Sequence, residues 1–214
     1  MEIPFQKIIN YIQTTCKIYN IDESHGTKHA LDIYKYCRNL VNCEVIIFPY
    51  INQQISVIYT AALLHNTCNK KYIDTNEGIS NVINFLHSTK KYSEEECENI
   101  TNIIQNLSYS VYKFEGSPIL GVYQQAYNIV KEADLLTTYD FDKSIVYNMN
   151  KYTIDYITAF RVSKKRFTIR IVKYISDGFI TSEYGVLEAT KLLRENCKNI
   201  VQIEQMLLYD DKHP

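Results

Sequence analysis

Glycine and proline are scarce in this 214-residue chain, which contains six glycines and four prolines. Flexible linkers are built from stretches rich in glycine, proline and serine, and no such stretch interrupts the sequence. We therefore expect one domain over residues 1–214, a length sufficient to bury a substantial core. The abundance of Ile, Asn, Lys and Tyr indicates an AT-rich coding sequence, which bears on the source and not on the function.

An excess of charge of one sign is also missing, since 23 basic side chains stand against 24 acidic ones and the formal net charge is -1. Proteins that hold nucleic acids usually carry a strong positive field, so we expect no nucleic-acid partner. Two short basic runs, at residues 90–91 and 164–166, are typical of solvated helix faces.

Disulfide frameworks, leader segments and membrane spans are not indicated either. The six cysteines are not dense, and none of their spacings is the CxxC of zinc and redox sites. The first residues lack the pattern of a signal peptide, and no apolar run approaches the roughly 18 residues that a membrane span needs. We therefore predict reduced thiols, no membrane partner and a location in the cytoplasm, or in the host cytoplasm if the source is a virus.

Apolar residues recur at helical spacing throughout, whereas strand alternation bounded by turn residues does not occur. The fold class is therefore predicted to be all-α, with about eight helices in a single-domain bundle. The segment KFEGSPILG (residues 113–121) is the clearest loop. We expect helices at residues 4–19, 24–42, 51–66, from 75 and from 93, and then at 122–138, 141–152, 154–176 and 182–209.

Several residues suit the ends of these helices. They are Pro4 in a first turn, Ser24, Thr75 and Ser182 as N-caps, Ser93 with Glu96 as a capping box, and Gly178 as a stop signal.

Three of the five histidines fall in two short segments, SHGTKHA (residues 24–30) and LLHNTCNKKY (residues 63–72). His25 and His29 are four residues apart, so on a helix they would share one face, as two metal ligands or a ligand and its supporting partner do. His65 ends an apolar helix and precedes polar residues, at a boundary between core and cleft. Surface histidines near a turn, and a core histidine that caps its helix, are the alternatives.

Asp134 lies inside an apolar helix, in the segment NIVKEADLLTTYD (residues 128–140). A carboxylate in such surroundings needs a partner. Pairing with Lys131, or a position on the solvent face of an amphipathic helix, are the alternatives to a role in a site.

The order of these residues on successive helices resembles the HD superfamily of metal-dependent phosphohydrolases, in particular its small single-domain branch. The similarity runs from about residue 21 to residue 184. IDESHGTKHALDIYKYC is similar to the family's SHGxxH helix, and LHNTCNKKY is similar to its LHDxxDxK segment. The resemblance implies a divalent metal, Mn, Co, Ni, Mg or Fe, held by His29, His65, Asp134 and the residue at position 66, which is Asn66.

The resemblance also implies roles for five further residues. His25, Asn69 and Glu77 are candidate catalytic residues, although a first-turn glutamate is also common in helices without a function. Lys71 and Lys113 are candidate substrate-binding residues because an ammonium group neutralises phosphate oxygens, and a solvated lysine is the alternative for both. The expected partner is a small-molecule phosphoester or nucleotide. Specificity in a fold comes from the cleft walls, so the sequence does not predict the substrate. It does not predict the oligomeric state either.

Two asparagines depart from the family pattern. Asn66 stands where the family has a ligand aspartate, and Asn69 stands where it has a further aspartate. A neutral amide removes one negative charge beside the cation, so metal affinity should fall by about 10-fold or more, the scale of changes around metal ligands. We therefore predict an HD-type phosphohydrolase with weakened activity and a weakly bound metal. The alternative is a catalytically inactive HD-fold protein, without metal, that binds a nucleotide or a protein.

A third hypothesis is a helical scaffold in which the histidines are coincidental. It requires His29, His65 and Asp134 to lie far apart.

Overall fold

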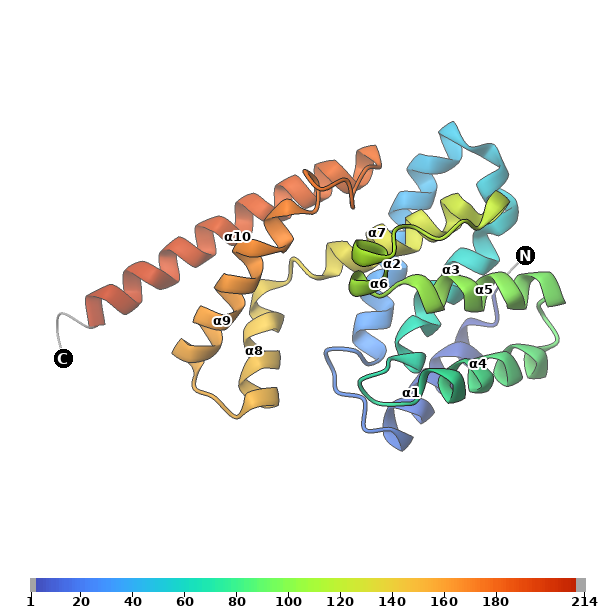
Figure 1. Ribbon diagram of the computed structural model, residues 1–214, viewed down its shortest axis with the longest axis horizontal. Coiled ribbons are helices and arrows are strands. Elements are labelled where there is room, and N and C mark those ends of the chain that lie inside the picture. Colours follow the sequence, from blue (N-terminus) through green and yellow to red (C-terminus); the bar gives the residue numbers. More distant parts are fainter. Residues whose placement is uncertain (1–2, 211–214) are drawn as a thin grey trace. The chain divides into compact units, whose positions relative to one another are not determined.

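The computed structural model describes residues 3–210, and within this range it contains ten α-helices, four short 3-10 helices and no strand (Figure 1). The all-α prediction is confirmed, and the number of helices is close to the eight expected. Over the same range, no helix combines the length and the apolar character that a membrane crossing requires. The chain divides into two compact units, Met1–Asp134 and Leu135–Pro214, and the single domain over 1–214 stays a prediction.

The first unit is organised around α3 (Ile55–Leu64), which packs against α1, α2 and α5. Its sequence, ISVIYTAALL, is apolar on nearly all sides, and such a helix is stable only inside a core. Ala61 and Leu64 are 0% exposed, and the other residues of its last turn are buried as well. The remaining elements are α1 (Phe5–Ile18), α2 (Thr27–Ile47), η1 (Pro49–Gln54), η2 (His65–Cys68), α4 (Thr75–Thr89), α5 (Glu94–Asn106), α6 (Tyr109–Phe114), η3 (Gly121–Tyr123) and α7 (Gln124–Thr137), whose last turn belongs to the second unit.

A close backbone approach joins α4 to η2 at Gly78. A Cβ atom added to Gly78 would lie 2.9 Å from Cα of Cys68 and 3.3 Å from Cγ2 of Ile73. Only glycine therefore lets α4 lie this close to the segment that begins at His65. The N-terminus of α4 is held by Asp74, whose Oδ1 accepts from the backbone N–H groups of Asn76 and Glu77.

The second unit contains α8 (Phe141–Tyr152), α9 (Tyr156–Ile169), η4 (Ile171–Lys173) and α10 (Glu183–Asp210). Its core is aromatic, because Phe141 makes T-shaped contacts with Phe160 and Phe167, and Tyr139 makes them with Phe167 and Tyr174.

Polar contacts bring α10 and α9 into this unit. The Asn196 side chain on α10 donates to the Tyr139 carbonyl at 2.7 Å, and Lys164 on α9 forms an ion pair with Glu204 on α10.

Most of the predicted helix ends are close to the observed ones, and the capping box of Ser93 and Glu96 is confirmed. Ser182 also acts as predicted, since its Oγ accepts from the backbone N–H of Gly185 at 3.0 Å. The predicted helix 154–176 was too long, because the backbone leaves the helical region at Arg170 (φ −126°, ψ −60°).

Two predicted N-caps were wrong. Ser24 does not cap α2, which begins at Thr27 after Gly26, because the Ser24 hydroxyl donates to Asp22 instead. Thr75 is the first residue of α4, and the carboxylate of Asp74 takes the capping position. The predicted loop from residue 113 is also shorter, since Lys113 lies in the last turn of α6.

Candidate functional site

His29 enters the site from the first turn of α2. Helix α2 begins where Gly26, in an extended conformation, ends the turn that contains His25. The neighbours of His29 on the inner face of α2, Ala30 and Ile33, are buried in the core, and His29 itself is 7% exposed. The core packing of α2 therefore holds this imidazole at the inner surface of the helix.

His65 enters from the end of α3, where the buried helix tightens into the 3-10 turn η2. Its Nδ1 lies 2.8 Å from the carbonyl oxygen of Ala62. A carbonyl only accepts hydrogen bonds, so Nδ1 carries a proton and donates it. In the neutral imidazole the other ring nitrogen, Nε2, then carries a lone pair and acts as an acceptor or a metal ligand.

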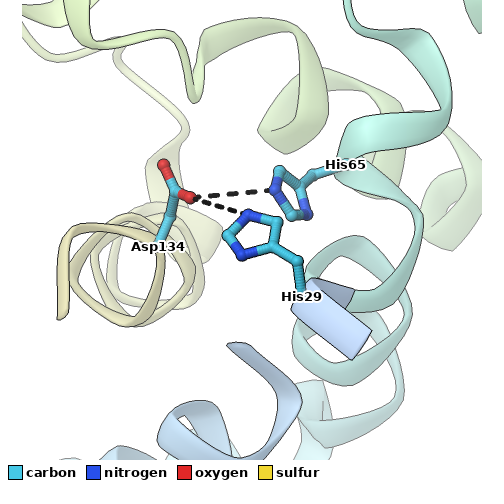
Figure 2. A group of neighbouring side chains, drawn as sticks. All are labelled: His29, His65 and Asp134. Carbon is cyan, nitrogen blue, oxygen red and sulfur yellow. Dashed lines mark ion pairs between the residues drawn. The ribbon is translucent and has the colours of Figure 1, made fainter. Parts of the chain in front are cut away.

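Asp134 completes the group from α7. Its Oδ1 lies 3.7 Å from Nε2 of His29 and 3.8 Å from Nε2 of His65, and Figure 2 shows the carboxylate turned toward both rings. The Asp134 side chain is 26% exposed, so it is reached by solvent while both imidazoles are buried. Asp134 therefore has two imidazole neighbours, as a carboxylate within an apolar helix requires.

These three side chains form a group that could hold a metal ion. One ligand atom from each lies within 4.8 Å of the other two, and two imidazoles with one carboxylate are common ligands of first-row divalent metals. Two ligands about 2.1 Å from one ion lie at most about 4.2 Å apart, and both distances to Asp134 are below that limit. The scaffold hypothesis requires the three residues to lie far apart, and in the structure they lie together.

Asn66 and Asn69 are hydrogen-bonded to one another next to this group. Nδ2 of Asn69 donates to Oδ1 of Asn66 at 3.2 Å, and Oδ1 of Asn69 accepts from the backbone N–H of Lys71 at 3.1 Å. Asn66 is 7% exposed and directly follows His65 in η2. Oδ1 of Asn66, the atom with which Asn66 would bind a metal, thus accepts from Asn69, and the ligation of a metal by Asn66 stays a prediction.

His25 lies at the centre of a second polar cluster, in the turn before α2 and not on that helix as expected. Its Nε2 accepts from Nζ of Lys71 at 3.1 Å, while Nδ1 lies 2.6 Å from Oγ of Ser24 and 3.0 Å from Oη of Tyr72. Both hydroxyls donate in turn to the carboxylate of Asp22. The ring of His25 is 6.1 Å from that of His29, so the two imidazoles are neighbours although they do not lie on one helix.

The electrostatics of this cluster keep His25 neutral. The pKa of His25 is lowered to about 4, chiefly by burial; the ammonium of Lys71 also lowers it, whereas Asp22 acts in the opposite direction. Burial raises the pKa of Asp22, but hydrogen bonds from Ser24 and Tyr72, together with His25, outweigh it and bring that pKa to about 2. At neutral pH, Asp22 is therefore ionised, and His25 is an uncharged acceptor that orients Lys71.

Two predicted site residues have their contacts elsewhere. Glu77 accepts from Oη of Tyr19 at 2.7 Å, in the first turn of α4. Nζ of Lys113 lies over the rings of Tyr109 and Phe114, at 5.5 and 5.6 Å from their centroids. Within the described part of the chain, Glu77 is not part of the group of His29, His65 and Asp134. The proposed roles of Glu77 and Lys113 stay predictions.

Sequence reasoning missed Asp22 and Tyr72. Asp22 precedes His25 by three residues, a spacing at which a turn brings two side chains together, and this signal was available. Tyr72 follows Lys71 directly but is 47 residues from His25, so only the folded structure reveals that contact.

Comparison of the chain with protein-family models, with curated proteins and with solved structures found no match.

Proposed function

We propose that this protein is an HD-type, metal-dependent phosphohydrolase that acts on a nucleotide or a related phosphoester with weakened activity. The metal would be held by His29, His65 and Asp134. The proposal combines the residue order, which resembles the HD superfamily, with the proximity of these three side chains in the first unit.

The observation that supports it best is the pair of acceptors formed by His65 and Asp134. The Ala62 carbonyl keeps the His65 proton on Nδ1, so the Nε2 lone pair and the Asp134 carboxylate oxygen lie 3.8 Å apart. Two electron-rich atoms at this distance are stabilised by a cation between them, and His29 Nε2 lies 3.7 Å from the same oxygen. A divalent metal satisfies all three atoms at once.

The chemistry of the ligands narrows the choice among the candidate metals. Imidazole nitrogens suit Fe, Co and Ni, whereas Mg prefers sites made of oxygen ligands and water. Among the five candidate metals we therefore expect Mn, Fe, Co or Ni to bind more tightly than Mg. When bound, such an ion lowers the pKa of a coordinated water and stabilises negative charge on a phosphoryl group.

Lys71 is the residue best placed to bind the phosphoester. Its ammonium is exposed, and the acceptor Nε2 of His25 holds it at 3.1 Å. Because the pKa of His25 is about 4, the ring stays neutral at pH 7 and does not repel this ammonium. Lys71 therefore offers a positive charge to phosphate oxygens, and it is positioned by His25, whose Nδ1 is held in turn by Ser24 and Tyr72.

The proposal is tested with metal-free protein titrated with Mn²⁺, Fe²⁺, Co²⁺, Ni²⁺ and Mg²⁺ by calorimetry, followed by a nucleotide panel assayed for released phosphate and pyrophosphate. Asp134→Asn should lower metal affinity by about 10- to 100-fold. Asp32→Asn makes the same chemical change on α2, outside the triad, and should leave the affinity unchanged. Equal affinities for parent and Asp134→Asn, or no turnover with any nucleotide and metal, would refute the proposal.

The Asn66–Asn69 hydrogen bond favours a second candidate, an inactive HD-fold protein that binds a nucleotide or a protein. Asn69 donates a hydrogen bond to Asn66 where the family has two carboxylates. This candidate predicts a purified protein without stoichiometric metal, and nucleotide binding without turnover. Full metal occupancy by elemental analysis would count against it, and turnover gained by Asn66→Asp would identify a disarmed enzyme.

A further inference from the structure

The orientation of the Asn69 side chain is fixed by a backbone donor. The oxygen and nitrogen of an amide exchange places by a half-turn, so their positions follow from the chemistry of their neighbours. The backbone N–H of Lys71 only donates, so the atom of Asn69 that lies 3.1 Å from it is Oδ1. Nδ2 of Asn69 therefore faces Asn66, and Asn66 must present its own oxygen in return, at 3.2 Å.

The other branch of Asn66 is consequently an N–H donor. This Nδ2 is buried and has no hydrogen-bond partner among the described residues. Buried donors are nearly always satisfied in folded proteins, by protein or by ordered water. An unpartnered donor beside His65, in a residue that is 7% exposed, indicates that an acceptor outside the chain completes the site.

We infer that Asn66 binds an anionic oxygen through Nδ2 instead of a metal ion through Oδ1, and that Asn69 determines this choice as a positioning residue. The ligand class is a phosphate or phosphoester oxygen, so the inference rests on the proposed function. An aspartate at position 66 would offer only acceptors and would repel such an oxygen. The asparagine pair thus replaces a group that binds a cation with an N–H group that donates a hydrogen bond to an anion.

Asn69→Asp tests this inference without altering Asn66. A carboxylate at position 69 still accepts from the Lys71 backbone N–H, but its second oxygen accepts where the amide now donates. Asn66 should then turn its Nδ2 toward position 69 and its Oδ1 outward. In calorimetric titrations, Mn²⁺ affinity should rise about 10-fold. Orthophosphate affinity of the metal-free protein should fall about 10-fold, as expected when a hydrogen bond to a charged group is lost.

Lys70→Gln is the matched control, since it changes the net charge by the same amount at the neighbouring, exposed position. It should alter both affinities by less than about threefold. If Asn69→Asp behaves like Lys70→Gln, or raises Mn²⁺ affinity without weakening orthophosphate, the inference is wrong. Asn66→Asp separates the two proposals. If Asn66→Asp gains Mn²⁺ affinity while Asn69→Asp does not, the proposed metal site is supported and only the inference about Asn66 is wrong. If neither the parent nor any variant binds Mn²⁺, the proposed function and the inference are both wrong.

A measurement on the parent protein tests the inference even if the variants do not fold. The side-chain amide resonance of Asn66 is assigned in a nitrogen-15 spectrum by its absence from the Asn66→Asp spectrum, or by selective labelling if that variant does not fold. Orthophosphate added to the metal-free parent should shift this resonance in a saturable way. An unchanged resonance at saturating orthophosphate, or no orthophosphate binding at all, would overturn the inference.

Discussion

Replacing Gly78 with alanine should loosen the contact between α4 and the segment that carries His65. The new Cβ would lie 2.9 Å from the Cα and 3.2 Å from the Cβ of Cys68, closer than atoms tolerate without movement. The nearest obstacle is backbone, so no side-chain rotation relieves the clash. Either α4 or η2 must shift, and η2 begins with His65 and Asn66.

Two opposing effects set the magnitude. Alanine is a better helix former than glycine, which alone would stabilise α4 by about 1 kcal/mol. Overpacking in a tight core costs about 1–3 kcal/mol, and the contact with backbone places Gly78 toward the upper end of that range. We therefore expect a net loss of about 1–2 kcal/mol in the free energy of unfolding. The melting temperature should fall by about 2–4 °C for each kcal/mol lost.

The assay is urea denaturation followed by circular dichroism, with Mn²⁺ affinity measured in parallel. Ser80→Ala, at an exposed position on the same helix, is the control and should change stability by less than about 0.5 kcal/mol. Gly78→Ala should weaken Mn²⁺ binding as well, because the shift moves the turn that carries His65. A variant as stable as the parent, or more stable, would refute the reasoning, since the gain in helix propensity would then outweigh the cost of overpacking.

Further predictions concern pH and the helix caps. The pKa of His25 is about 6.5 in the unfolded chain and about 4 when folded, so the unfolded state binds more protons between these values. Stability should therefore fall by an amount on the order of 3 kcal/mol as pH drops from 6.5 to 4, and His25→Gln should flatten this dependence in denaturation curves. The lowered pKa of Asp22 predicts a further loss of stability between pH 4 and pH 2, which Asp22→Asn should reduce. Ser93→Ala in the first unit and Asp155→Ala in the second each remove an N-cap and should cost about 1 kcal/mol; if residues 1–214 form one cooperative domain, both lower the same calorimetric transition, and separate transitions would contradict that expectation.

The sequence predicted the helices and the triad because both leave strong local signals. His65 stands where an apolar helix meets polar residues, and Asp134 is a carboxylate within an apolar segment. Such positions are costly unless a partner exists, so they indicate a site even before the fold is known. The prediction that both residues lie near His29 depended on the order of the motifs, which resembles that of the HD superfamily.

The rest depends on contacts between distant parts of the chain. Tyr72 and Lys71 reach His25 across 47 and 46 residues, so no local pattern identifies the cluster that holds its pKa near 4. The orientation of Asn66 depends on a backbone N–H that no composition or spacing identifies. The sequence also does not indicate the end of a helix where the apolar pattern continues past it, as it does beyond Arg170 at the end of α9.

The burial of three thiols gives this protein a built-in reporter of local opening. Each of the six cysteines is free; Cys43 and Cys197 are exposed, whereas Cys37 on the His29 helix, Cys68 in η2 and Cys97 on α5 are buried. Burial raises the pKa of Cys68 to about 11 and that of Cys37 well above its usual value. Thiolates are the reactive form, so a thiol reagent should label the exposed pair quickly and the three buried thiols only when the first unit opens. The slow labelling rate thus measures how often the surroundings of the site unfold, and a ligand that binds the closed form should slow it.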